Sequence, residues 1–240
     1  MKQFALSIRP AAAALTIGLL SCGGDLTLPN STAAGLKVAV TQGDGQVGTV
    51  GQALPQAVMV QVLTETDVPI AGRTVAFVPS GAQATEGFQP DTAVTNSQGE
   101  ALTHWVLGTV PGVYTAEARI VAEGDSVVPA VPIQAEARPG APDTLSAAGP
   151  TYQPGRRNQT LAEPLVVVAV DRFGNPVEGA QVEWKTSSGG QLSQELAPTG
   201  ADGKSSVTWT LGDRIGVQKA TAKVDGATGS PVTFTATVLF

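Results

Sequence analysis

The second half of this chain is a variant of its first half. Residues 69–72 (Pro-Ile-Ala-Gly) align with residues 176–179 (Pro-Val-Glu-Gly), and residues 105–108 (Trp-Val-Leu-Gly) align with residues 209–212 (Trp-Thr-Leu-Gly). An internal period of this kind indicates that one structural unit is repeated. Each unit is about 100 residues long, which is the size of an independent β-sandwich. The 240-residue chain is therefore predicted to hold two similar domains in tandem.

The sequences of both units have the pattern of short β-strands. Apolar residues alternate with polar ones, and Gly, Pro, Asn and Asp punctuate the runs. Alternation with a period of two predicts strands that are buried on one face. The predicted strands centre on residues 58–62, 75–77, 105–107 and 116–120, and on residues 182–184, 207–211 and 220–224.

The N-terminus has the features of an export signal. Lys2 and Arg9 supply positive charge, and an apolar run follows at residues 11–20. That run is too short to cross about 30 Å of hydrocarbon as a stable helix, but it has the length of a signal-peptide core. The chain is therefore predicted to be exported.

The end of this signal resembles the lipobox of bacterial lipoproteins. Leu19, Leu20 and Ser21 precede Cys22, which is the one cysteine of the chain. The resemblance implies cleavage before Cys22, lipidation of that residue and attachment to a membrane through the acyl chains. Gly23, rather than an aspartate, follows the cysteine and by the same resemblance favours the outer membrane. An ordinary secretory signal with an incidental cysteine is the alternative.

The domain boundaries follow from the export signal and from the joint between the two repeated units. A Pro-Gly-Ala-Pro sequence at residues 139–142 marks the joint between the units. The predicted order is a signal peptide at 1–21, a flexible tether at 22–35, a first sandwich at 36–138 and a second sandwich at 139–240.

The second unit resembles a known family. Residues 168–184 include Asp-Arg-Phe-Gly-Asn-Pro-Val-Glu-Gly, and residues 207–212 read Val-Thr-Trp-Thr-Leu-Gly. These motifs are similar to the group 1 bacterial Ig-like domain, which is stacked in invasin and intimin adhesins. The first unit has Asp-Val-Pro at 67–69 in place of Gly-Asn-Pro, and Phe77 in place of the tryptophan. The resemblance implies an all-β chain with two tandem immunoglobulin-like β-sandwiches after a lipoprotein signal peptide, and it carries no catalytic residues.

Large rings are predicted to anchor both cores. The single cysteine cannot form a disulfide within the chain, so stability must come from packing. Burying one aromatic ring removes about 150–250 Å² from water. The predicted core anchors are Phe77, Trp105, Trp184 and Trp209.

Glycines define the predicted turns. Gly174 and Asn175 suit a turn, because both residue types accept positive φ, and Pro176 fixes the φ that follows. Gly72 and Gly179 are expected where φ is positive or where a side chain would clash.

Residues suited to catalysis or metal binding are sparse. His104 is the only histidine, and it alternates away from Trp105, so we expect it to face outward or to be half-buried. Calcium needs six to eight oxygen ligands, and the chain has no Asp-x-Asp-x-Asp-Gly loop. The sequence therefore predicts no cofactor and no enzyme activity, with a hydrolase or metalloenzyme as a remote alternative. The turn carboxylates considered for calcium are Asp67, Asp91, Asp171, Asp202 and Asp213.

One polar loop combines residue types that are enriched in binding hot spots. It contains Tyr152, Arg156 and Arg157. We expect a possible partner contact there, to a protein or a surface glycan, with an ordinary solvated loop as the alternative. The net charge of −6 argues against a nucleic-acid partner.

These observations predict a non-enzymatic, lipid-anchored cell-envelope protein that acts in surface display, spacing or adhesion. The alternative is a periplasmic scaffold that docks another envelope protein through exposed β-edges. The membrane face, the ligand and the oligomeric state stay open at this point.

Overall fold

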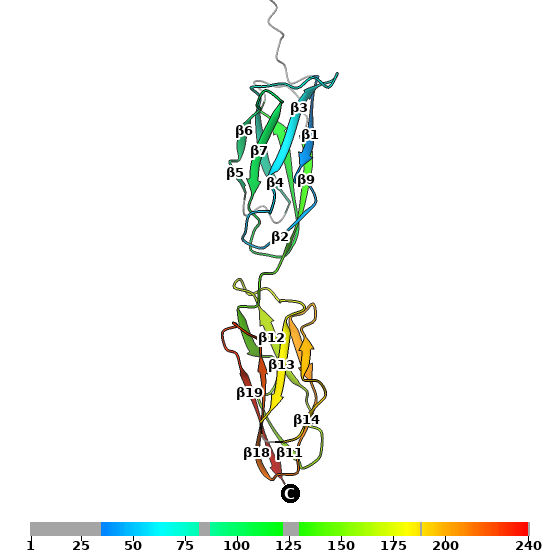
Figure 1. Ribbon diagram of the computed structural model, residues 1–240, viewed down its shortest axis with the longest axis vertical. Coiled ribbons are helices and arrows are strands. Elements are labelled where there is room, and N and C mark those ends of the chain that lie inside the picture. The colour runs from blue at the N-terminus through cyan, green and yellow to red at the C-terminus, as the bar shows by residue number, and fades with distance from the viewer. Residues whose placement is uncertain (1–34, 82–86, 122–129, 188, 240) are drawn as a thin grey trace, which may run out of the picture. The chain divides into compact units, whose positions relative to one another are not determined.

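The computed structural model describes residues 35–81, 87–121, 130–187 and 189–239. Every regular element in these ranges is a β-strand, and the strands surround two separate hydrophobic cores (Figure 1). The predicted signal peptide, with Leu19, Leu20, Ser21 and Cys22, and most of the predicted tether lie outside the described residues. The predicted domain bounds stay a prediction.

The first sandwich has two facing sheets. Neighbouring strands are antiparallel, except that β2 pairs with β9 in parallel. One sheet contains, in spatial order, β1 (Leu36–Gln42), β3 (Val58–Thr64), β7 (Glu100–Trp105) and β5 (Phe88–Gln89). The other contains β2 (Gln46–Thr49), β9 (Ala130–Arg138), β8 (Gly112–Ile120), β4 (Thr74–Ser80) and β6 (Thr92–Val94).

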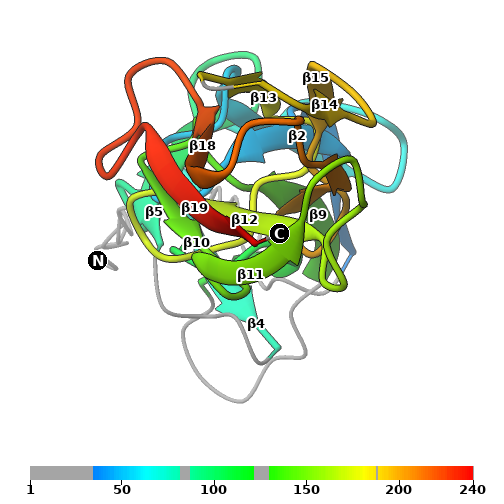
Figure 2. The ribbon, with the colours of Figure 1, turned by 90° about the horizontal axis from the view of Figure 1, so that it is seen from below.

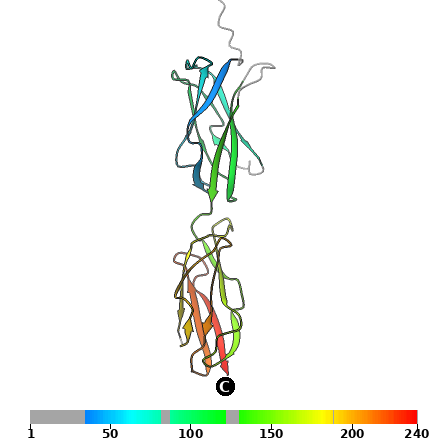
Figure 3. The same ribbon diagram turned by 90° about the vertical axis from the view of Figure 1, so that its right-hand side faces the viewer.

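The second sandwich repeats this plan (Figure 3). Its β11 lies beside β19 in parallel, as Figure 2 shows. One sheet contains β10 (Thr144–Ala147), β12 (Leu165–Val170) and β16 (Lys204–Val207), and β14 (Gln191–Leu192) pairs with β17 (Trp209–Thr210). The other contains β11 (Tyr152–Arg156), β19 (Val232–Leu239), β18 (Gly216–Lys223), β13 (Gln181–Thr186) and β15 (Leu196–Pro198).

Aromatic rings fill the first core. The ring centroid of Phe88 lies 4.9 Å from that of Trp105 and 5.4 Å from that of Phe77. These spacings are within the range that favours aromatic pairs. All three side chains are buried, so one continuous aromatic layer joins β4 and β5 to β7.

The second core uses a different third ring. The ring centroid of Trp184 lies 5.8 Å from that of Phe234 on β19, and Trp209 is also fully buried. The buried indole N–H of Trp184 donates to Ser205 Oγ at 3.2 Å. This hydrogen bond satisfies a polar group that would otherwise be costly to bury.

A buried threonine fastens the same turn in each sandwich. Thr95 Oγ1 donates to the carbonyl of Ile70 at 2.8 Å and accepts from the amide of Arg73 at 2.9 Å. Thr199 Oγ1 donates to the carbonyl of Val177 at 2.6 Å and accepts from the amide of Ala180 at 2.9 Å. The repetition of a complete buried hydrogen-bond set shows that the two units share more than their apolar pattern.

The predicted turn glycines take positive φ. Gly174 has a φ of +85°, but Asn175 is not among the positive-φ residues, so only the glycine takes that conformation. Asp67 occupies the position equivalent to Gly174 and has a φ of +63°, which aspartate tolerates better than most residues. Gly72 and Gly179 have φ of +74° and +76°. Neither would place a Cβ within 4 Å of a neighbour, so φ rather than crowding explains these glycines.

The predicted strand at 207–211 is two strands. β16 ends at Val207 and pairs with β12, whereas Trp209 belongs to β17 and pairs with Leu192 of β14. Val207 and Trp209 both face the core, so the apolar alternation continues across the break. The first unit likewise ends β7 at Trp105, before Leu107.

We predict that Trp184→Ala lowers the free energy of unfolding of the second sandwich by about 3–5 kcal/mol. The change removes a fully buried ring and leaves a cavity. Urea unfolding followed by tryptophan fluorescence and circular dichroism measures the loss. Tyr152→Ala, at a side chain that is 57 % exposed, is the matched control and should change stability by less than about 0.5 kcal/mol. Equal effects of the two substitutions would contradict the assignment of Trp184 as a core anchor.

Candidate functional site

An open strand edge lies in the second sandwich, where the chain between β13 and β15 changes sheets. β13 pairs with β15 from Gln181 to Glu183, and the last bond is from the Trp184 amide to the Glu195 carbonyl at 2.8 Å. Before Glu195 the chain belongs to the other sheet, since the Ser193 amide donates to the Thr208 carbonyl at 3.0 Å. The end of β13 therefore loses its neighbour on this side.

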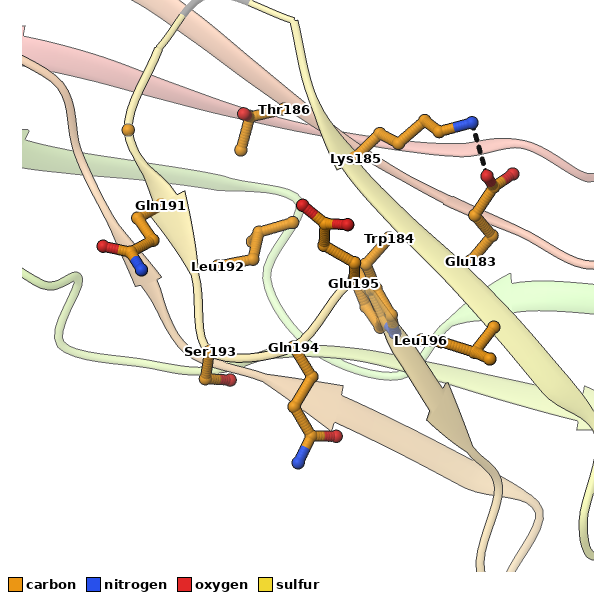
Figure 4. Close-up of a pocket in the computed structure, with 11 residues that line it drawn as sticks. Glu183, Trp184, Lys185, Thr186, Gln191, Leu192, Ser193, Gln194, Glu195 and Leu196 are labelled. Atoms are coloured by element: carbon orange, nitrogen blue, oxygen red, sulfur yellow. Dashed lines mark ion pairs between the residues drawn. The ribbon is translucent and has the colours of Figure 1, made fainter.

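A hollow of about 600 Å³ occupies the resulting gap (Figure 4). Its walls are residues 183–186 of β13 and residues 190–196 of the switching segment. The volume falls within the range of about 300–1,000 Å³ that is typical of ligand pockets. Leu192 is partly buried against the core, and the buried ring of Trp184 lies behind the hollow.

The charges at the hollow are unequal. Lys185 forms an ion pair with Glu183 on β13, and both side chains are substantially exposed, so the pair contributes little stability. The carboxylate of Glu195 points into the hollow beside Leu192 (Figure 4). Among the described residues this carboxylate has no ion-pair partner. The hollow therefore offers one uncompensated negative charge.

The described lining is mainly polar. It presents hydroxyls of Thr186 and Ser193, side-chain amides of Gln191 and Gln194, and carboxylates. Leu192, Leu196 and Trp184 are its apolar residues. Such groups hold a ligand by hydrogen bonds and charge, and the arrangement supplies shape and polarity rather than an acid–base pair.

The predicted partner-contact residues lie on a different part of the second sandwich. Tyr152 and Arg156 are the first and last residues of β11, and both side chains are exposed on the same face of the strand. Arg157 is exposed in the turn that follows. Strand alternation thus brings Tyr152 and Arg156 together on the outer face of the sheet, and their role as a contact stays a prediction.

The structure also places the residues considered for catalysis or metal binding. His104 is exposed on β7. In the part of the chain that the structure describes, no three His, Cys, Asp or Glu side chains are grouped so that they could hold a metal ion. Asp67 pairs with Lys37 at 2.8 Å, and Asp202 accepts from the Lys204 amide at 3.1 Å.

Asp171 organises the turn after β12. Its Oδ1 accepts from the amides of Phe173 and Asn175, both at 2.9 Å, and its Oδ2 accepts from Asn175 Nδ2 and the Gly140 amide, both at 3.0 Å. Burial alone would raise the pKa of this carboxyl, but the four hydrogen bonds outweigh it and lower the pKa below its usual value. Asp171 is thus fully engaged in holding the turn.

Comparisons with known proteins agree with this architecture. Residues 157–237 match the family model of the bacterial Ig-like domain (group 1). No curated protein matches the chain. A search for membrane-crossing helices finds none in the described ranges.

Among solved structures, the chain is similar to FdeC, an Escherichia coli adhesin, at 19 % identity with a TM-score of 0.54, over 86 % of this chain and 64 % of that one. It is also similar to InvD of Yersinia pseudotuberculosis, at 18 % identity with a TM-score of 0.47, over 86 % of this chain and 58 % of that one. A third similar structure is invasin, described as a bacterial integrin-binding protein, at 26 % identity with a TM-score of 0.37, over 85 % of this chain and 39 % of that one. The chain spans less than two thirds of each. The likeness to FdeC shows a shared fold, and the all-β, immunoglobulin-like fold predicted from the sequence is confirmed.

The open edge is a feature that the sequence reasoning missed. Phe88 pairs with Trp105 as Leu192 pairs with Trp209, so Phe88 and Leu192 are equivalent positions. Aligning these two residues between the repeats would have shown an aliphatic side chain in the second unit where the first unit has a ring. The available signal was thus a difference between repeats rather than a motif.

We predict that Asp171→Asn destabilises the second sandwich by about 2 kcal/mol at pH 7, because charge-assisted hydrogen bonds to a buried carboxylate are lost. The folded pKa of Asp171 lies below its unfolded value, so its contribution is present above about pH 4 and is lost as the pH falls through the folded pKa. Urea unfolding at pH 7 and at stepwise lower pH values measures this trend. The difference between the two proteins should shrink below about pH 4.

Asp202→Asn is the control for this experiment, because Asp202 is an exposed turn residue whose side chain is 63 % accessible. Its effect should stay within about 0.5 kcal/mol at every pH. A difference for Asp171→Asn that does not depend on pH would show that the charge of the carboxylate plays no part.

Proposed function

We propose that this chain is a non-enzymatic, lipid-anchored protein of the cell envelope that acts in surface display, spacing or adhesion. The observation that carries the proposal is the match of residues 157–237 to the bacterial Ig-like domain (group 1), in a chain whose fold is shared with an adhesin of Escherichia coli. The lipid anchor and the cellular role are proposals, since they rest on sequence and on likeness of fold.

The anchor is supported by the sequence around Cys22. Leu19, Leu20 and Ser21 precede this cysteine as in a lipobox. Acyl chains bury about 0.8 kcal/mol per CH₂, so several chains give durable attachment where one is marginal. Gly23 at the next position favours the outer membrane in this interpretation.

The sandwiches suit a display role because each is a densely packed, self-contained unit. The buried aromatic rings and the threonine hydrogen bonds are internal to each sandwich. Such a unit keeps its shape while its outer faces vary. Tyr152 and Arg156 on the outer face of β11, with Arg157 beyond it, offer one candidate contact for a protein or a surface glycan.

A periplasmic scaffold is the second candidate function. The observation that favours it is the unpaired end of β13 at the hollow, because free strand edges recruit strands of other proteins. In this case the same fold would hold another envelope protein inside the outer membrane rather than meet a ligand outside the cell.

Protease treatment of intact cells that express the native chain tests the proposal. We expect the native chain to be cell-bound and clipped by the protease, because its sandwiches face outward. The Cys22→Ala chain should be released, because it lacks the lipid attachment site.

Two results would change the account. A Cys22→Ala chain that stays as firmly cell-bound as the native chain would contradict lipid anchoring. A native chain that resists the protease until the envelope is opened would contradict surface display and would favour the periplasmic scaffold.

A further inference from the structure

The first sandwich supplies a template for what the hollow of the second sandwich can hold. Phe88 is equivalent to Leu192, and its ring is 5 % exposed and stacks on Trp105. In the second sandwich the extra core ring comes from Phe234 on β19 instead, and Leu192 is only partly buried. The position at the strand switch, beside an open hollow, thus carries an aliphatic side chain where the sister domain carries a ring.

The backbone at the same place directs one amide toward the hollow. The amide of Trp184 points toward β15, and the amide of Ser187 points toward β18, where it donates to the Lys219 carbonyl at 3.0 Å. Successive residues of a strand direct their amides to alternate edges. The N–H of Thr186 therefore points toward the hollow, past the last bond between β13 and the Glu195 segment.

The charge at the hollow adds selectivity. The Glu195 carboxylate points into it, while Lys185, the cation among the lining residues, is engaged by Glu183. A ligand with a cationic group next to its apolar part would compensate Glu195.

We propose that this hollow docks an extended segment of a partner protein, which adds to the open edge of β13 antiparallel to it. The segment places an aromatic side chain over Leu192, where Phe88 lies in the first sandwich, and a lysine or arginine two residues later against Glu195. This inference rests on the binding role proposed above and specifies one site and one class of partner.

The geometry of strand addition is consistent with this arrangement. A segment antiparallel to β13 runs in line with β15 and approaches Glu195 with its C-terminal end. Residues two apart on a strand face the same side, so the aromatic and cationic groups reach the hollow together. Because the edge is short, the added strand forms few backbone hydrogen bonds with β13. The aromatic side chain must therefore contribute much of the affinity.

The test is an NMR titration of the ¹⁵N-labelled full-length Cys22→Ala chain with the peptide acetyl-Thr-Phe-Thr-Lys-Thr-amide. We expect saturable shifts of the amides of Thr186, Leu192 and Glu195. The indole N–H of Trp209 is a further reporter, because a Cβ on Gly190 of the hollow wall would lie 3.0 Å from this nitrogen. The same peptide with alanine in place of phenylalanine should bind at least about tenfold more weakly, because it buries no ring.

Three variants separate the parts of the proposal. Leu192→Phe restores the ring of the first sandwich and should weaken peptide binding at least about tenfold, with a melting temperature no lower than that of the parent chain. Thr186→Pro removes the open N–H on an edge where proline is tolerated, and should also weaken binding. Glu195→Gln should weaken binding of this peptide but not of one with glutamine in place of lysine.

Several outcomes would overturn the inference. Equal affinity for the phenylalanine and alanine peptides would show that no aromatic anchor contributes to binding. Unchanged binding by Leu192→Phe would place the peptide elsewhere. Shifts at Thr186 and Leu192 that depend on protein concentration without peptide would assign the edge to a second copy of the chain. Each of these results can occur whether or not the chain is lipid-anchored, so the cell experiment and this titration fail independently.

Discussion

The burial of aromatic rings in the core is the interaction on which each sandwich depends. A chain with one cysteine has no disulfide with which to tie its sheets together. In the first sandwich, Phe77, Phe88 and Trp105 form a continuous stack between strands of both sheets. In the second, Trp184 and Phe234 pack together on one sheet, and Trp209 is buried in the same core. Dense packing of this kind explains how small, aromatic-poor domains hold together without a disulfide.

The same packing connects the core to the candidate site. In both sandwiches the chain changes sheets beside the core tryptophan, and the neighbouring strand extends past its last bond on that side. These last bonds run from the Phe77 amide to the Asp91 carbonyl and from the Trp184 amide to the Glu195 carbonyl, both at 2.8 Å. Phe88 stacks on Trp105 at the switch of the first unit, whereas Leu192 at the switch of the second is partly buried beside the hollow.

Much of the fold could be predicted from the sequence because the relevant signals are local and repeated. The alternation around Trp105, Trp184 and Trp209 indicates their burial, and the internal repeat indicates two equivalent sandwiches. The break of the strand at Thr208 could not be predicted, because Val207 and Trp209 both face the core and keep the alternation intact across it. The alignment of Asp-Val-Pro at 67–69 with Gly-Asn-Pro already pointed to a shared turn, in which Asp67 takes the positive φ of Gly174.

The candidate site was the part of the molecule that was hardest to predict from the sequence. Its essential group is a backbone N–H at Thr186, and no side-chain pattern records which strand edge is left open. Tyr152, Arg156 and Arg157 were suggested by residue type alone, and the structure places the first two on one exposed face of β11. A sequence therefore reveals an unusual combination of side chains more readily than it reveals that a strand lacks a neighbour on one edge.

Amide hydrogen exchange along β13 tests the central claim, that the end of this strand is an open edge, most directly. The account predicts slow exchange at Trp184 and Ser187, whose amides donate to Glu195 and Lys219, and fast exchange at Thr186 between them. Slow exchange at all three amides would show that the edge is closed in solution and would contradict the account.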